Sequence, residues 1–176
     1  MKMKNIMLFL LLSNFIIAPL LGQTKKEKKE QKAIQEAQDF ENMKAVIDNR
    51  IYEFRADWTT SSQGARVNLM TRANLLKINK DSIDVNLSYF GVLQSGSSGI
   101  SNQQGVVFNG LMENYTVTVN EKKSNISVKF ATKGRHDQFQ FYLTVFGNGN
   151  STLNVSSTVR SSSKYDGTTK ESKPKE

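Results

Sequence analysis

One histidine and no cysteine limit the chemistry that this sequence of 176 residues can carry. His136 lies among turn-forming residues (133–137), and nothing places a base beside a nucleophile, as a serine or cysteine hydrolase requires. A zinc site needs three or four nitrogen or sulfur ligands, which one histidine cannot supply. We therefore expect no catalytic site, no metal and no other cofactor.

Paired carboxylates are the catalytic alternative that the residue types leave open. Glu53, Asp57 and Asp84 occupy the polar positions of alternating segments, where solubility and cross-strand pairing with Arg55 or Lys77 explain them more simply. A hydrolase of this kind needs two carboxylates within about 10 Å of each other in a concave site. The sequence gives no further support for such a pair.

Aromatic side chains are the remaining candidates for a functional site. Most of them recur on the apolar faces of alternating segments, where they either fill the core or line an apolar pocket in a wide barrel. Trp58 and Tyr89, near the ends of their segments, would then lie at the mouth of the pocket beside the Gly- and Ser-rich loop 91–105. The candidate pocket and mouth residues are Tyr52, Phe54, Trp58, Tyr89, Phe90, Phe108, Phe139 and Phe141.

The elements that must position these residues have a period of two. Apolar and polar residues alternate over 52–58, 83–89, 115–119, 126–130 and 139–145, as in antiparallel strands with one buried and one wet face. Asn- and Gly-rich turns separate these segments, and no proline occurs between residues 20 and 173. We predict a mainly β fold, an antiparallel meander of eight or nine strands forming a barrel-like closed sheet or a sandwich.

One α-helix is expected before the strands. Ala33, Ala37, Phe40, Met43 and Ile47 recur at helical spacing and predict a helix over 33–49 that docks on the sheet. The Lys- and Glu-rich residues 23–32 are predicted to form a charged flexible arm, and 169–176 a disordered tail. A single β domain is thus expected over residues 33–168.

The first 22 residues have the pattern of a signal peptide. Lys2 and Lys4 precede an apolar run of 16 residues (6–21), and the small Gly22 follows it as the expected cleavage point. A spanning helix needs about 20 apolar residues, so we expect no transmembrane span after cleavage. The protein is therefore expected in the periplasm or outside the cell.

The net charge of +8 does not indicate a nucleic-acid partner. Residues 33–163 contain 13 basic and 11 acidic residues, so the excess of positive charge lies mainly in the leader and the tails. A nucleic-acid-binding domain would concentrate that charge on one face of its folded part.

Several weak motifs occur in one order along the chain. They are the helix leading into Ile51-Tyr52-Glu53-Phe54, the segment DSIDVNLSYFG (81–91), the loop leading into Gly105-Val106-Val107-Phe108, and VRSSSKYDG (159–167). Together they resemble an exported family of Bacteroidetes catalogued as domain of unknown function 4251, over about residues 30–169. The resemblance implies an envelope or secreted β domain with no assigned activity and no catalytic residues to carry over.

Three functions are compatible with these features. The first is a monomeric, non-catalytic binding module that holds a small apolar molecule in the barrel interior or at loop 91–105. The second is a structural or assembly protein of the bacterial envelope that contacts an envelope protein through its helix or an outer sheet face. The third is the carboxylate-based hydrolase.

Overall fold

The computed structural model describes residues 25–61, 64–71, 73–91, 105–133 and 137–172. One α-helix, one short 3₁₀ helix and ten strands lie in this part of the chain: α2 (Lys25–Asn49), β1 (Ile51–Thr60), β2 (Arg66–Asn68), β3 (Leu75–Asn79), β4 (Ser82–Ser88), β5 (Gly105–Leu111), β6 (Glu113–Asn120), η1 (Glu121–Lys123), β7 (Asn125–Lys133), β8 (Gln138–Phe146), β9 (Asn150–Ser157) and β10 (Ser163–Glu171).

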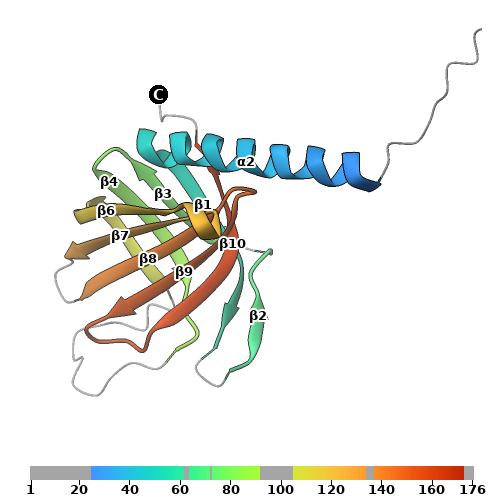
Figure 1. Ribbon diagram of the computed structural model, residues 1–176. Coiled ribbons are helices and arrows are strands. Elements are labelled where there is room, and N and C mark those ends of the chain that lie inside the picture. The colour runs from blue at the N-terminus through green and yellow to red at the C-terminus, as the bar shows by residue number, and fades with distance from the viewer. Residues whose placement is uncertain (1–24, 62–63, 72, 92–104, 134–136, 173–176) are drawn as a thin grey trace, which may run out of the picture. The chain divides into compact units, whose positions relative to one another are not determined.

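The strands form one antiparallel sheet in the order β5-β4-β3-β1-β10-β9-β8-β7-β6, and β2 pairs with β1 off this path (Figure 1). Strands β3 to β5 continue as a meander from one side of β1. Strands β6 to β10 form a second meander, and β10 returns to pair with the other side of β1. Strands β5 and β6 lie at the two ends of this order and do not pair with each other, so the curled sheet is a half-barrel with two edges. The two end strands are consecutive in the chain and are joined through Met112. The predicted mainly β, barrel-like antiparallel fold with an N-terminal helix is confirmed.

The inner face of the sheet carries the apolar half of each alternating strand. These side chains form one buried cluster to which eight strands contribute, and Tyr52, Phe54, Phe141, Leu76 and Leu153 in it are fully or almost fully buried. Burying each side chain of this size contributes about 1.5–3 kcal/mol to folding. The hydrophobic effect therefore explains the curl, because a flat sheet would leave the same face in water.

The part of α2 from residue 34 onward covers one end of the sheet (Figure 1). Phe40, Met43 and Ile47 form its buried stripe. The β8–β9 turn approaches the helix so closely that a Cβ on Gly147 would come within 2.9 Å of the Phe40 backbone nitrogen. At the C-terminus of the helix, Lys80 donates from Nζ to the Asn49 carbonyl oxygen at 2.9 Å. The helix thus connects the turns at this end of the half-barrel.

Two boundaries differ from those expected from the sequence. Helix α2 begins at Lys25, inside the segment expected to be a charged arm, because Lys, Glu and Gln are good helix formers even without a packing face. Ala33 and Ala37 are exposed, so the packed stripe begins only at Phe40. Among the described residues, no helix is long and apolar enough to cross a membrane.

Strand β10 extends to Glu171, into the segment expected to be a disordered tail. Its inward positions include two small polar residues, Ser163 and Thr169, that are buried. The Thr169 hydroxyl forms a 2.7 Å hydrogen bond with the Ser151 hydroxyl of β9, so burial leaves neither group without a partner. Polar pairing therefore replaces apolar packing along this central strand.

A β-bulge in β1 reverses the alternation that the sequence shows. The register with β10 shifts between Ala56 and Trp58, and Gly167 lies opposite Ala56. Beyond the bulge Thr59 is buried and Trp58 is half-buried on the opposite face, with the Arg66 guanidinium 4.6 Å from its ring centroid. Trp58 therefore leaves the inward row of Tyr52 and Phe54, because one extra residue shifts the faces of a strand.

Candidate functional site

The outer face of β6–β9 carries the polar half of the alternating strands. Strand pairing places these side chains in rows: Thr116 lies opposite Lys129, Lys129 opposite Tyr142, and Tyr142 opposite Asn154. Neighbouring strands lie about 4.8 Å apart, so a row over three strands spans about 10 Å. Regular hydrogen bonding of four adjacent strands therefore fixes the positions of these side chains relative to one another.

A groove of about 570 Å³ lies on this face. Its volume is within the range of about 300–1,000 Å³ that is usual for small-molecule sites. Its lining is amphipathic, because neutral polar side chains lie beside a larger share of apolar surface. Among the described lining residues none is acidic: Asn114, Thr116, Lys129, Phe130, Ala131, Gln140, Phe141, Tyr142, Asn154, Val155, Ser156 and Ser162.

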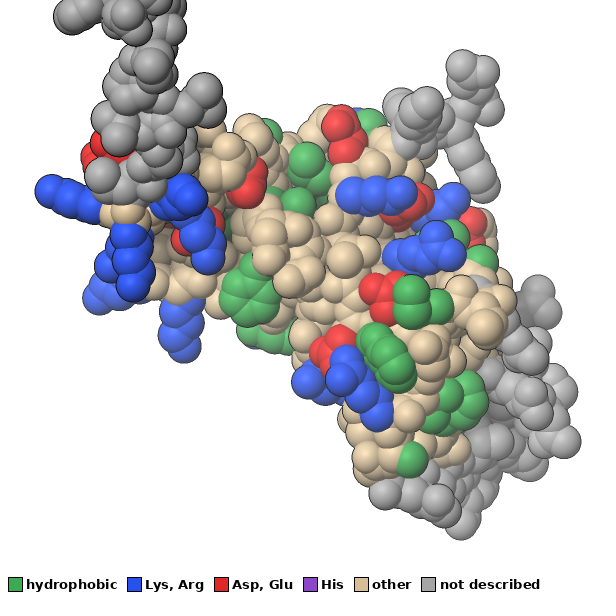
Figure 2. Space-filling model, turned by 90° about the vertical axis from the view of Figure 1, so that its right-hand side faces the viewer, with side chains coloured by type: hydrophobic (Ala, Val, Ile, Leu, Met, Phe, Trp, Pro, Cys, Tyr) green, Lys and Arg blue, Asp and Glu red, His purple; other side chains and the backbone are tan. Residues whose placement is uncertain are grey.

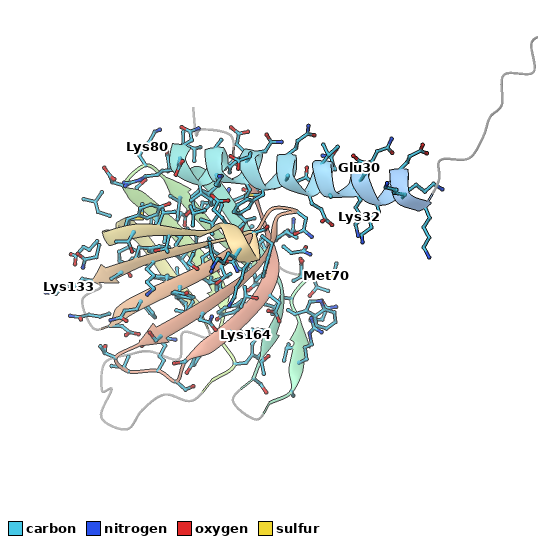
Figure 3. All side chains as sticks on the ribbon, viewed as in Figure 1. Glu30, Lys32, Met70, Lys80, Lys133 and Lys164 are labelled. Carbon is cyan, nitrogen blue, oxygen red and sulfur yellow. The ribbon has the colours of Figure 1, made fainter. Side chains whose placement is uncertain are left out.

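A second hollow of about 420 Å³ continues the first toward the β7–β8 end of the sheet. The two share Asn114, Ala131, Gln140 and Ser156, so they form one depression, which we call the outer groove. Lys133, labelled in Figure 3 at the end of β7, lies in this second part.

A bulge in β6 brings Asn114 into the outer groove. The register between β6 and β7 shifts between Glu113 and Thr116, so one extra residue lies on the β6 side. Asn114 adopts a positive φ of 56°, in the left-handed region that Asn tolerates better than most residues. Tyr115 then points inward, while Glu113 and Asn114 both line the hollows. Bulges of this kind commonly redirect side chains beside binding sites.

Tyr142 is the exposed aromatic residue of the outer groove, with 38% of its surface accessible. Its hydroxyl donates to the Ser127 hydroxyl at 3.3 Å, and the Lys129 ammonium lies 5.1 Å from the ring centroid. The ring is therefore held along the sheet surface at its hydroxyl end. Lys129 on one side and Asn154 on the other are its cross-strand neighbours in the groove.

Stacked aromatic rings support the groove from the inner side of the sheet. Phe130 and Phe141 stack at a centroid distance of 4.8 Å, and Tyr115 and Phe139 extend the stack at 6.3 and 6.2 Å. The Tyr115 hydroxyl pairs with that of Tyr52 at 3.2 Å, and burial raises the pKa of both tyrosines. This packing fills the inner side of the strands beneath the groove.

A buried ion pair lies at the end of the sheet opposite the helix. Arg160 donates from Nε to Oδ2 of Asp137 at 3.1 Å, and from Nη1 to the Gly105 carbonyl oxygen, also at 3.1 Å. The other carboxylate oxygen of Asp137 accepts from the hydroxyls of Ser157 and Thr158, which line the groove. Arg160 therefore connects the start of β5 with the strands that form the groove.

The aromatic residues predicted to form a pocket do not all share one environment. Tyr52, Phe54, Phe139 and Phe141 are buried in the core, and the two on β8 also line the outer groove from below. Phe108 is half-buried against the core from the end strand β5. For these five residues, binding of an apolar ligand stays a prediction.

The residues predicted to lie at the mouth of the pocket differ in their surroundings. Tyr89 is half-buried, and its hydroxyl bonds to the Ser161 hydroxyl at 2.8 Å, whereas Phe90 is 42% exposed. Trp58 lies on the outer face beyond the β1 bulge.

Figure 2 views the side of the molecule around β2, where hydrophobic side chains form several separate groups with charged side chains between them. His136 and most of loop 91–105 lie outside the described residues.

Sequence reasoning missed the residues that line the outer groove. Asn114, Gln140 and Asn154 occupy ordinary polar positions of alternating strands, where solubility explains them equally well. Only the strand register shows that they converge on one depression. A cluster of amides at wet positions of consecutive strands was the signal available in the sequence.

The fold and the groove define a mainly β half-barrel domain with a capping helix and an amphipathic depression on its outer face. Residues 34–169 match the family described as Domain of unknown function (DUF4251), and the chain belongs to that family. No curated protein matches the sequence.

A solved structure has a similar fold. It is the crystal structure of a DUF4251 family protein from Bacteroides eggerthii, with 16% sequence identity to this chain and a TM-score of 0.59. The likeness covers 78% of this chain and 91% of that one. At this identity the likeness supports the half-barrel fold and carries nothing about ligands.

Proposed function

We propose that this protein is an exported, non-catalytic binding domain that holds its ligand in the outer groove. The observation that carries the proposal is a groove of about 570 Å³ whose amphipathic lining comes mainly from four adjacent strands and is supported by a stacked aromatic core. This lining, with hydrogen-bonding side chains beside apolar surface, suits an amphipathic ligand better than the purely apolar molecule expected from the sequence.

The groups that line the outer groove are suited to binding rather than to reaction. They are mainly amides and hydroxyls, with Lys129 in the larger hollow and Glu113 with Lys133 in the smaller one. A glycosidase would need two carboxylates across the site, and the described lining contributes one. The lining therefore favours the binding module over the carboxylate-based hydrolase.

Export is supported by the leader-like residues 1–22, which lie outside the described residues. Expression of the full chain in a bacterium, followed by cell fractionation and mass analysis, tests this part of the proposal. We expect protein outside the cytoplasm with an N-terminus close to Gln23. Recovery of the uncleaved chain in the cytoplasm would contradict it.

Blocking the groove tests the binding function. Asn154 is exposed on the outer face at the middle of β9, and Asn154→Trp would fill the groove without entering the core. Asn86→Trp, at an exposed position of β4, is the matched control. The purified exported protein and both variants are screened by thermal shift against soluble oligosaccharides, peptides, nucleotides and fatty acids.

We expect one of these classes to raise the Tm of the wild type and of Asn86→Trp but not of Asn154→Trp. A class that stabilises all three proteins equally would place the binding site elsewhere. A screen in which no class stabilises the wild type would also contradict the proposal.

The second candidate function, assembly with an envelope protein, is favoured by the end strand β5. This strand contains neither proline nor a charged residue, and Val107 and Leu111 are 59% and 72% exposed. Edge strands of this kind are open to pairing with another strand unless charges or prolines protect them. A photo-crosslinking residue at position 107, compared with one at the exposed position 168 of the central strand β10, tests this candidate in living cells. One defined partner is expected at 107 only, and equal labelling at both positions would exclude it.

A further inference from the structure

We infer that the ligand of the outer groove is a carbohydrate, bound through amide side chains and the ring of Tyr142. The inference rests on the proposed function, because it concerns the same groove, and it adds the chemical class of the ligand. Three features of the lining support it: uncommitted amides from three strands, an exposed aromatic ring, and a charge too low for a polyanion.

The first feature is a set of amides that have hydrogen-bonding capacity to spare. Asn114, Gln140 and Asn154 project from β6, β8 and β9 into the larger hollow. Within the described residues, their side chains make no hydrogen bond and form no ion pair. Each amide offers a carbonyl acceptor and two N–H donors side by side. Neighbouring sugar hydroxyls, which both donate and accept, match that pattern.

Hydroxyl groups complete the same surface. Thr116, Ser156 and Ser162 line the larger hollow and, among the described residues, likewise have no side-chain hydrogen bond. Six neutral polar side chains thus line one depression, and none of them has a side-chain hydrogen bond within the described part of the chain. A polar surface of this kind gains most from a ligand that replaces water with several hydrogen bonds at once.

The second feature is the Tyr142 ring, which lies between Lys129 of β7 and Asn154 of β9 in one cross-strand row. Its hydroxyl donates to Ser127, and the Lys129 ammonium lies over the ring, 5.1 Å from its centroid, so a sugar that packs on the ring from that side displaces the ammonium. The C–H face of a sugar ring is apolar and packs on an aromatic ring, while its hydroxyls remain at the edge for the amides. The row spans about 10 Å, which is comparable with a disaccharide.

The third feature is electrostatic. Lys129 is the one charged residue among the described lining of the larger hollow, and residues 33–163 contain 13 basic and 11 acidic residues. A nucleic-acid site would need a line of cations with stacking aromatics, and a fatty acid would need an enclosed apolar cavity. The lining of the outer groove has neither property, so an uncharged, polyhydroxylated ligand fits it best.

An array of neutral and acidic oligosaccharides, probed with the purified exported protein, tests the inference. Calorimetric titration with the strongest oligosaccharide then follows for four variants that all occupy exposed positions of the outer sheet. Tyr142→Ala and Asn154→Ala each remove one proposed contact, Tyr142→Phe keeps the ring, and Asn86→Ala is the matched control on β4.

We expect a neutral oligosaccharide to bind, with affinity reduced about tenfold by Tyr142→Ala and by Asn154→Ala. Asn86→Ala should bind as the wild type does, whereas Tyr142→Phe, which keeps the ring but loses the hydrogen bond to Ser127, should bind more tightly than Tyr142→Ala and no more tightly than the wild type. Circular dichroism with thermal melts confirms that all variants fold. An array without binding, or binding that neither alanine variant weakens, overturns the inference.

The outcomes for the two proposals are distinguishable. If peptides or nucleotides stabilise the protein and Asn154→Trp abolishes that effect, the groove is the binding site and only the carbohydrate inference fails. If an oligosaccharide binds equally to Asn154→Trp, the outer groove is not the site and both proposals fail.

Discussion

Asp137 and Arg160 form an ion pair with an Nε to Oδ2 distance of 3.1 Å, and their side chains are only 10% and 5% exposed. The pair joins the start of β8 to the β9–β10 connection and, through the Gly105 carbonyl, to the end strand β5. A half-barrel has no closing strand pair at its edges. Through Arg160, the end strand β5 is therefore connected to β8 and β9, strands with which it does not pair in the sheet.

Removal of one partner of this pair should be costly, because it leaves the other charge buried and unpaired. We expect Asp137→Asn or Arg160→Met to lower the free energy of unfolding by about 3–5 kcal/mol. The control is Lys164→Ala, which breaks the exposed Lys164–Asp166 pair and should cost at most about 1 kcal/mol. Urea denaturation at neutral pH measures all three, and equal losses would show that the buried pair has no special role.

Gly167 has no room for a side chain at the β1 bulge. A Cβ there would overlap the Arg55 carbonyl oxygen and the backbone of Ala56, which belong to the paired strand. We expect Gly167→Ala to destabilise the fold by about 3 kcal/mol, because the new Cβ forces β1 and β10 apart or out of their native register. Gly110→Ala is the matched control, because there the new Cβ would meet only the Phe108 ring, which can move. Thermal melts of the two variants compare them directly, and a similar Tm for both contradicts this explanation.

The reversal of faces at the β1 bulge predicts unequal effects for two neighbouring aromatic residues. Phe54 is fully buried, so Phe54→Ala should cost about 3–5 kcal/mol through the cavity it leaves. Trp58 is half-buried on the other face, and Trp58→Ala should cost roughly 1–2 kcal/mol. Chemical denaturation followed by circular dichroism measures both. If Trp58→Ala were as damaging as Phe54→Ala, Trp58 would belong to the core.

Alkaline pH should destabilise the protein through its buried tyrosines. Burial raises the pKa of Tyr165 from 10.0 to about 12, and burial together with Tyr115 raises that of Tyr52. The folded state therefore binds these protons more tightly than the unfolded state. The stabilising contribution is complete below pH 10 and is lost as pH rises toward 12, with a slope of about 1.4 kcal/mol per pH unit for each tyrosine.

Unfolding by urea at several pH values from 9 to 12 checks this slope. Tyr165→Phe removes one titrating group and should reduce the slope, although it also removes the 3.0 Å hydrogen bond to the Ser88 carbonyl oxygen and lowers the stability at neutral pH. An unchanged slope in Tyr165→Phe would show that other groups cause the alkaline instability.

The sequence predicts the fold class and most of the strands because burial on one face imposes a period of two. It fails at β10, whose inward positions are Ser163, Tyr165 and Thr169, with only one apolar residue among them. Hydrogen bonds such as that between Ser151 and Thr169 stabilise this strand, and such pairing depends on the neighbouring strand rather than on local pattern.

The candidate site could be predicted less well than the fold. The outward residues Asn114, Gln140 and Asn154 look like ordinary solvated positions until the register brings them together. The β1 bulge likewise moves Trp58 off the inner face, and nothing in the alternation of Tyr52, Phe54, Ala56 and Trp58 indicates it. Faces and rows depend on which strands pair, which is long-range information that the local period does not contain.

The pairing of β1 with β10 joins the first and last strands at the middle of the sheet. Loop-closure entropy makes contacts between such distant segments late events in folding. The central pair forms only when nearly the whole chain is available, so a partly synthesised or partly translocated chain lacks the strand that unites its two meanders. For the export proposed above, this topology has a consequence. The chain completes its fold only after β10 has crossed the membrane, and until then it lacks the central strand pair that would stabilise a folded, untranslocatable state.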